Sequence, residues 1–328
     1  MAVVATGFFD GVHPGHRLVI DTLLAEAAAR GEESVVVTFW PHPRAVLQNG
    51  ADSLRYLTAR EERVALLRSL GVDRVETVPF TKDFASLSCV QYLEMLCRDY
   101  GCSSLVLGYD TRFGSGQEGP EEIAAAARRL GLGVTIAPPV CSPDGAPISS
   151  SRIRSALEQG DVALAAALLG RPYRLHGVVV SGNHLGRTIG FPTANMKLYE
   201  PLMLIPSNGV YETRVYVGSA PGSVIPEALP PVAWNGRGPR SGRGSEATSP
   251  ESHSPERYLG LTNIGIRPTV GERNALTLET HILDFDQMIY GLDITVDFIS
   301  RIRDERKFSS LQDLRLQLLS DAALVRRF

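Results

Sequence analysis

Residues 7–16 read GFFDGVHPGH and join an apolar stretch to a helical one. Residues 3–8, VVATGF, predict a short strand, and residues 16–31, HRLVIDTLLAEAAARG, predict a helix closed by a glycine. A tight glycine turn between a strand and a helix directs backbone N–H groups and the positive helix end outward, where they bind anions. His13 and His16 lie in this turn and can donate hydrogen bonds to phosphate oxygens. The turn therefore predicts a nucleotide site at the end of a strand.

The rest of the first half alternates strand-like and helix-like segments. Strand-like runs occupy residues 33–40, 72–80, 103–110 and 133–140, with helical stretches between them. One of these helices, residues 58–71, is expected to have Thr58 as its N-cap. The alternation predicts a mostly parallel sheet covered on both faces, with ligands at the carboxyl ends of the strands. The FWPHP turn and the LGYDTRFGSGQEG loop fall at such ends, beside the glycine turn.

The second half has a different pattern. A helical unit, residues 149–170, is followed by five strand-like runs and one closing helical stretch, residues 309–328. This order predicts a small antiparallel barrel. We therefore expect an α/β domain over residues 1–170 and a β-barrel domain over residues 171–328.

Residues 218–257 interrupt the barrel. Gly, Pro and Ser supply half of this stretch, so it cannot bury enough apolar surface to offset the entropy of ordering. It is expected to be a disordered insertion between two strands.

Composition narrows the class of protein. The formal net charge is −3, which does not predict a nucleic-acid partner. The four cysteines show no CxxC spacing, and their sparseness fits a reducing compartment. The first residues do not resemble a signal peptide, and no apolar run is long enough to span a bilayer. A cytoplasmic enzyme without a membrane partner is the expectation, and the oligomeric state is left open.

Three further stretches offer groups for phosphate or proton chemistry. Residues 148–154, ISSSRIR, could clamp phosphates at a helix start or could form an ordinary cap with a solvated face. Residues 181–195, SGNHLGRTIGFPTAN, suit a phosphate loop with oxygen ligands for Mg²⁺, or a plain glycine-rich hairpin. In residues 275–283, ALTLETHIL, alternation puts Glu279 opposite the apolar face, where solvent exposure is the simpler interpretation.

Taken together, these motifs resemble the bacterial bifunctional riboflavin kinase/FMN adenylyltransferase family, also called FAD synthetase. The resemblance runs from about Val4 to the last helix and omits only the insertion. In the first half it rests on GFFDGVHPGH, TFWPHP, GYDTRFG and ISSSRIR. In the second half it rests on GRTIGFPTAN, GVY, TNIGIRPTVG, LETHILDFDQMIYG and IRDERKF.

The resemblance implies two ATP-dependent reactions. The barrel would phosphorylate riboflavin to FMN with Mg²⁺, and the α/β domain would transfer AMP to FMN, giving FAD and pyrophosphate. It implies that Glu279 is the general base of the kinase, that Thr193 and Asn195 hold Mg²⁺ and ATP, and that His13 and His16 contact ATP phosphates. The remaining cofactor-binding residues that we infer are Gly7, Phe9, Asp10, Gly11, Gly15, Pro41, His42, Pro43, Asp110, Arg112, Phe113, Gly114, Ser149, Ser150, Ser151, Arg152, Arg154, Gly182, Gly186, Arg187, Gly190 and Pro192.

The chain departs from the family pattern in a few places. Thr111 replaces the usual Phe in GYDxRFG, which removes an aromatic ring from a loop expected to face flavin. Compared with the family pattern, the segment before the first predicted strand is short and the insertion at residues 218–257 is long. Two other functions stay open: another HxGH nucleotidyltransferase, acting on phosphopantetheine or a polyol phosphate, or a flavin-binding module with one half inactive.

Overall fold

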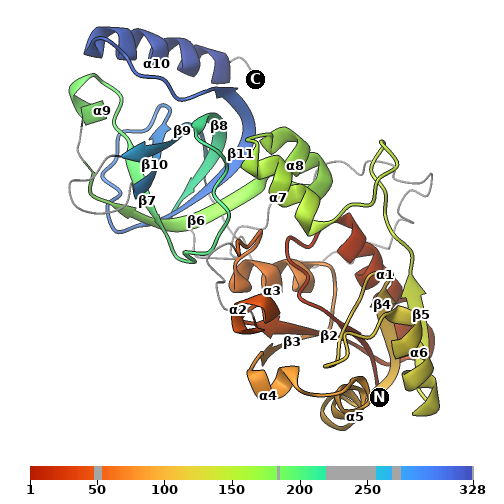
Figure 1. Ribbon diagram of the computed structural model, residues 1–328. Coiled ribbons are helices and arrows are strands. Elements are labelled where there is room, and N and C mark those ends of the chain that lie inside the picture. The colour runs from red at the N-terminus through yellow and green to blue at the C-terminus, as the bar shows by residue number, and fades with distance from the viewer. Residues whose placement is uncertain (48–53, 183–184, 219–255, 268–274, 327–328) are drawn as a thin grey trace. The chain divides into compact units, whose positions relative to one another are not determined.

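A computed structural model describes residues 1–47, 54–182, 185–218, 256–267 and 275–326 (Figure 1). The chain divides into two compact units at Ser150/Ser151, and each is described by itself. The insertion predicted at residues 218–257 lies outside the described residues apart from its two ends.

The first unit is built on a sheet of five parallel strands in the order β3-β2-β1-β4-β5, which confirms the predicted α/β architecture. Its strands are β1 (Ala2–Thr6), β2 (Glu33–Trp40), β3 (Arg74–Pro79), β4 (Cys102–Gly108) and β5 (Gly133–Ala137). The central strand β1 is buried throughout because helices cover both faces of the sheet. Its carboxyl end leads directly into the GFFDGVHPGH turn.

Two helices pack on each face of this sheet. Apolar residues of α1 (Pro14–Arg30) and α3 (Arg60–Ser69) form one core cluster with the strands, and those of α5 (Cys89–Tyr100) and α6 (Pro120–Arg129) form the other. A capping box at Ser88 begins α5, and Gly31 and Gly101 end α1 and α5 in the left-handed conformation. Two short helices, α2 (Pro43–Leu47) and α4 (Lys82–Ala85), complete the unit.

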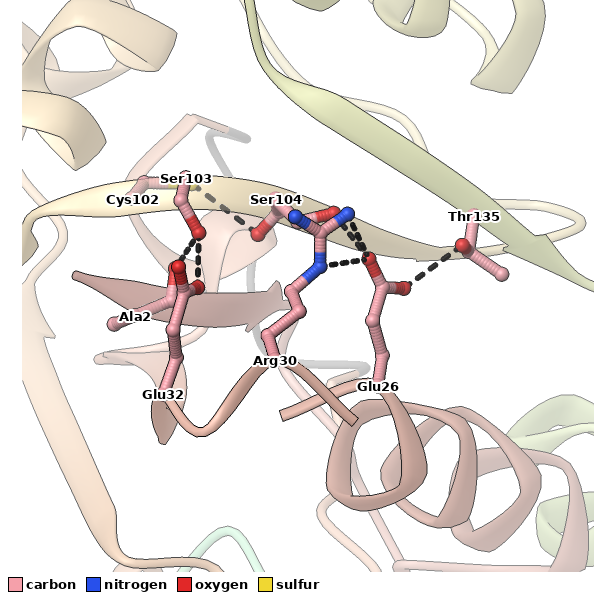
Figure 2. A network of polar contacts seen from close by, with 8 residues as sticks. All are labelled: Ala2, Glu26, Arg30, Glu32, Cys102, Ser103, Ser104 and Thr135. Carbon is pink, nitrogen blue, oxygen red and sulfur yellow. Dashed lines mark hydrogen bonds and ion pairs between the residues drawn. The ribbon is translucent and has the colours of Figure 1, made fainter. Parts of the chain in front are cut away.

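A polar network holds the last turns of α1 against the amino ends of the strands (Figure 2). The Glu26 carboxylate accepts hydrogen bonds from Ser104 Oγ at 2.5 Å, Thr135 Oγ1 at 2.8 Å and Arg30 Nε at 3.0 Å. Nearby, Ser103 Oγ donates to Glu32. Burial alone would raise the pKa of Glu26, but these hydrogen bonds outweigh it and leave the pKa below its ordinary value. The network therefore fixes the end of α1 that lies away from the histidines.

The expectation that Thr58 caps α3 is wrong. The N-cap of α3 is Ala59, which makes no side-chain capping bond. Thr58 is fully buried, and its hydroxyl accepts a hydrogen bond from Gly11 N at 3.1 Å. The hydroxyl is thus used to hold the glycine turn, and this tertiary contact outweighs the local capping preference.

The second unit begins with two helices that precede the barrel. They are α7 (Ser150–Glu158) and α8 (Val162–Leu169), and Asp161 caps α8 by accepting a hydrogen bond from Leu164 N. α8 packs on β11 (Asp293–Arg303) and β6 (Tyr173–Val180) (Figure 1).

The predicted antiparallel barrel is confirmed. The described strands close in the order β10-β7-β6-β11-β8-β9. The remaining strands are β7 (Ala194–Leu198), β8 (Gly209–Val217), β9 (Arg257–Arg267) and β10 (Ala275–Ile282). β7 was not predicted, because it begins inside the PTAN motif, at Ala194, where the sequence resembles a loop. A single turn, α9 (Leu185–Thr188), and the closing helix α10 (Leu311–Val325) complete the unit.

Buried ion pairs tie the barrel together. Arg174 on β6 donates to both carboxylate oxygens of Asp297 on β11, at 2.5 and 2.7 Å. Arg303, at the end of β11, donates to Asp321 on α10 at 2.8 Å, and Asp321 is fully buried. The second pair anchors α10 to the barrel.

Candidate functional site

The GFFDGVHPGH turn adopts an unusual backbone. Phe9, Gly11 and Val12 have positive φ angles of 55°, 85° and 42°. Backbone conformations of this kind are costly for residues with side chains and persist where surrounding contacts enforce them. The enforcing contacts come from Asp10, which is buried and whose carboxylate accepts hydrogen bonds from Leu57 N at 3.0 Å and Thr58 N at 3.1 Å. The structure thus gives Asp10 the role of anchoring the turn.

The turn brings the two histidines together. His13 immediately precedes α1, and the rings of His13 and His16 stack with centroids 3.7 Å apart and planes 18° apart. The His16 ring also meets Phe9 edge-on at 5.3 Å. A Cβ on Gly15 would lie 3.1 Å from the His13 ring, so a glycine at this position lets the ring lie close to the backbone. The pair sits at the positive end of α1, as an anion site requires.

An aromatic cluster adjoins the turn, and sequence reasoning missed its centre. The Phe8 and Tyr56 rings contact each other, and each also contacts the rings of Trp40 and His42. Arg63 of α3 is fully buried, with its guanidinium 3.9 Å from the centroid of the Phe8 ring and Nη2 donating to Phe39 O at 3.1 Å. Burial lowers the pKa of Arg63 to about 10, and the nearby Asp10 carboxylate opposes that shift. The sequence offered no signal, since an arginine inside TAREERVALL is ordinarily on a solvated helix face.

His42 and its two prolines form a tight corner after β2. His42 Nδ1 accepts a hydrogen bond from Arg44 N at 3.0 Å, which stabilises the start of α2. Pro41 follows a cis peptide bond, and Pro43 is the first residue of α2. Gly7 lies one residue beyond β1, and a Cβ there would touch the Phe9 ring at 3.4 Å.

The GYDTRFG loop is ordered by its own hydrogen bonds. Thr111 Oγ1 accepts a hydrogen bond from Gly108 N at 2.9 Å, so this threonine closes the turn after β4. The Phe113 ring packs edge-on against Tyr92 at 5.0 Å, in the core cluster of that face. A Cβ on Gly114 would lie 2.7 Å from Cys89 N, which requires glycine there. Asp110 is exposed, and Arg112 donates to Gln117 O at 3.1 Å.

A hydrogen bond from Ser150 attaches the serine run to the same turn. Ser150 Oγ donates to Asp10 O at 2.9 Å, and a Cβ on Gly15 would lie 3.7 Å from Ile148 O. Ser149 lies in the same unit, whereas Ser151, Arg152 and Arg154 belong to α7 in the second unit.

In the barrel unit, two cavities share Thr193 as a lining residue. One has a volume of about 290 Å³ and is bounded by Glu279 and His281 of β10 and by Leu314 and Leu318 of α10. The other has a volume of about 330 Å³ and is bounded by Thr280, Ile282, Arg187 and residues 285–290. Thr193 lines both.

Strand register places three polar side chains in a row. Glu279 of β10 pairs with Asn195 of β7 on one side and with Asn263 of β9 on the other. Residues directly opposite on antiparallel strands share a face, with Cβ atoms about 5 Å apart. Thr193, two residues before Asn195, also lines the cavity that Glu279 and Asn263 line. Sequence reasoning missed Asn263, although it lies inside the TNIGIRPTVG motif.

The glycines of this site allow close packing of the backbone. A Cβ on Gly182 would overlap the Asn195 side chain, and one on Gly186 would overlap Phe191 O. Phe191 N donates to Gly186 O at 2.8 Å, and Gly190 has a φ of 82°. Substitution of these residues would displace Asn195 or the turn that ends at Pro192.

The donor set suits a hard cation bound with few protein ligands. Thr193 and Asn195 offer neutral oxygens, and Mg²⁺ accepts such ligands together with substrate phosphates. Among the residues that the structure describes, no group of three His, Cys, Asp or Glu side chains forms a metal site by itself. In the same part of the chain, no helix combines the length and apolarity needed to cross a membrane.

Comparison with known proteins agrees with the division of the chain into an α/β part and a barrel part. Residues 1–152 match the family model of FAD synthetase, and residues 169–328 match that of riboflavin kinase. The bifunctional riboflavin kinase/FMN adenylyltransferase of Bacillus subtilis is 34% identical over 98% of this chain and 90% of its own length. The protein of that name from Escherichia coli is 34% identical over 99% of this chain and 92% of its own.

A solved structure shows the same fold along the whole chain. It is described as a macrolide-efflux protein from Streptococcus pneumoniae, is 30% identical, and superposes with a TM-score of 0.82 over 100% of this chain and 94% of that one. The two domain matches and the nearly full-length identity establish that the chain belongs to the bifunctional riboflavin kinase/FMN adenylyltransferase family.

Proposed function

We propose that the barrel unit phosphorylates riboflavin in the cavity lined by Glu279, Asn263 and Thr193, and that the product FMN is adenylylated at the histidine turn of the first unit. The bifunctional activity is that of the family. The kinase assignment rests on one observation. Glu279 lines a cavity, and the strand register places it between Asn195 and Asn263. We assign adenylyl transfer to residues 1–170 and phosphorylation to residues 171–328.

The residues that line each barrel cavity suit a different ligand. The smaller cavity is walled by Phe191, Leu261, Phe308, Leu314 and Leu318, which suit the flat apolar ring of riboflavin. The larger cavity presents Arg187, Gln287 and Tyr290, which suit a nucleotide with its phosphates. Thr193 lines both cavities, as we expect of a residue beside the transferred phosphoryl group.

The chemistry of the kinase follows from this placement. The primary hydroxyl of riboflavin is a poor nucleophile. The Glu279 carboxylate accepts its proton as the oxygen attacks the γ-phosphorus of ATP, the bond from that phosphorus to the β,γ-bridging oxygen breaks, and ADP leaves. Thr193 and Asn195 would hold Mg²⁺, which offsets the phosphate charge when bound. Arg187 and the backbone around Gly186 and Gly190 orient the phosphates.

The adenylyl transfer needs no covalent intermediate. An oxygen of the FMN phosphate attacks the α-phosphorus of ATP, and pyrophosphate leaves. His13 and His16 donate hydrogen bonds to phosphate oxygens as charge builds on them, and the amino end of α1 adds its positive potential. We assign the flanking Pro41–Pro43 corner, the Asp110–Gly114 loop and the serine–arginine segment 149–154 to the same flavin and nucleotide contacts.

A cytoplasmic location is part of the proposal. All four cysteines are free, as expected in a reducing compartment. The match of residues 169–328 to a kinase model argues against a single-function HxGH transferase.

Chromatography of riboflavin incubated with Mg-ATP and the protein tests the assignment. We expect FMN to appear first and FAD to follow, and a chelator of Mg²⁺ to stop the first step. A protein that makes FAD from supplied FMN but never phosphorylates riboflavin would contradict the kinase assignment.

A further inference from the structure

A side-chain hydrogen bond continues the contact between β10 and β7 beyond the point where their backbone pairing stops. The backbone register between these strands covers only Glu279 with Asn195 and Thr280 with Ala194. One residue further along β10, His281 Nδ1 lies 2.8 Å from Pro192 O. Pro192 immediately precedes Thr193, so this bond holds the segment that leads into β7.

The chemistry of the acceptor fixes the state of the imidazole. A carbonyl oxygen can only accept a hydrogen bond, so Nδ1 of His281 carries the proton. The His281 ring also packs against the ring of Phe191 at 4.9 Å, and Phe191 is buried. Phe191, Pro192 and Thr193 are therefore held from β10 by one ring contact and one directed bond.

The same strand carries the proposed base. Glu279 and His281 are two residues apart on β10, so they share a face, and both line the cavity that Thr193 also lines. A shift of the Pro192 carbonyl would move Thr193 relative to Glu279. Displacements of about 1 Å in such an arrangement are enough to slow a reaction strongly.

We propose that His281 is a positioning residue of the kinase, which sets Thr193 against Glu279 by donating from Nδ1 to the Pro192 carbonyl. The inference rests on the proposed function, because it uses the roles given there to Thr193 and Glu279. His281 acts through Pro192 and Thr193, so its loss affects nucleotide binding and phosphoryl transfer together.

Replacement of His281 tests the bond directly. His281→Leu removes the donor, and His281→Asn keeps an amide N–H near the position of Nδ1, whereas His281→Gln places it near that of Nε2. We expect His281→Leu and His281→Gln to raise the KM for Mg-ATP in riboflavin phosphorylation about tenfold, the scale of one lost hydrogen bond, and His281→Asn to recover most of it. Adenylylation of supplied FMN should stay at the parent rate in all three.

His176→Leu is a matched control. His176 is a half-buried barrel histidine whose Nδ1 bonds to Thr295 Oγ1 at 2.7 Å, and it lines neither cavity. We expect it to leave the KM for Mg-ATP within twofold of the parent value.

A double-mutant cycle separates positioning from general destabilisation. If His281 acts through Thr193, His281→Leu costs about tenfold in kcat/KM in the parent but less than twofold in a Thr193→Ala background. An equal loss in both backgrounds, a parent-like KM in His281→Leu, or no difference between Asn and Gln would overturn the inference. Failure of the proposed function gives a different result: Glu279→Gln would then phosphorylate riboflavin at the parent rate.

Discussion

At the scale of single residues, the proposed kinase mechanism depends most on Glu279 as the proton acceptor. Glu279→Gln keeps the shape of the side chain and removes the proton acceptor, so we expect riboflavin phosphorylation to slow by roughly 10²–10⁴-fold. Adenylylation of supplied FMN should continue, because we assign that chemistry to the histidine turn. Phosphorylation assays on the variant, with Glu256→Gln as an exposed control, provide the measurement. A near-parent rate would show that Glu279 is not the general base and would favour the simpler interpretation that it is an exposed residue.

Arg63 is expected to stabilise the first unit, although the sequence does not indicate that this side chain is buried. The guanidinium is fully buried and contacts Phe8 and the Phe39 carbonyl. Arg63→Ala removes that support beneath the turn, so we expect a loss of about 3 kcal/mol in the free energy of unfolding. Arg60→Ala, on the exposed side of the same helix, should change it by less than about 0.5 kcal/mol. Chemical denaturation of both variants compares them, and similar effects would refute the supporting role of Arg63.

At the scale of elements, α1 is held at one end by Glu26 and presents His13 at the other. Burial raises the pKa of Glu26, but its hydrogen bonds together outweigh burial and hold the pKa below its ordinary value in the folded protein. A carboxyl with a depressed pKa stabilises the fold above its unfolded pKa and loses that contribution as the pH falls through the folded value. We expect Glu26→Gln to destabilise the protein by about 1–3 kcal/mol at pH 7 and by less below pH about 4.

Thermal unfolding at both pH values measures this difference. Glu94→Gln, at an exposed position of α5, is the control and should leave the melting temperature unchanged. A Glu26→Gln penalty that stays constant between pH 7 and pH 3.5 would show that its ionised form does not contribute.

Much of the element order follows from sequence pattern, and its failures have local causes. The strands of the first unit follow from the alternation of strand-like and helix-like segments, and the end of α1 at Gly31 follows from its glycine. The prediction that Thr58 caps α3 failed because the Thr58 hydroxyl accepts a buried hydrogen bond from Gly11 instead. β7 was not predicted because its five residues, which follow a proline turn, alternate too little between apolar and polar side chains to indicate a strand. Arg63 and Asn263 could not be predicted, since burial and register depend on partners distant in sequence.

At the scale of the whole molecule, the insertion can be tested by removal. Tyr216 of β8 pairs with Arg257 of β9, so the two strand ends that flank residues 219–255 lie side by side. Joining Gly218 to Glu256 through Asn-Gly should close the strands as a hairpin and shorten the loop. We expect the trimmed protein to phosphorylate riboflavin within about twofold of the parent rate. Loss of FMN formation in a folded deletion variant would give the insertion a role in the kinase.

The central claim is that one chain carries two separate sites that act in sequence. Mixing two disabled variants tests it most directly: Glu279→Gln, and the double variant His13→Ala, His16→Ala. Alone with riboflavin and Mg-ATP, the first should make almost no FMN, and the second should stop at FMN. Together they should form FAD, because FMN released by one variant is adenylylated by the other. If the mixture makes no FAD while each variant is folded, or if either variant alone loses both activities, the two sites are not separate and the account is wrong.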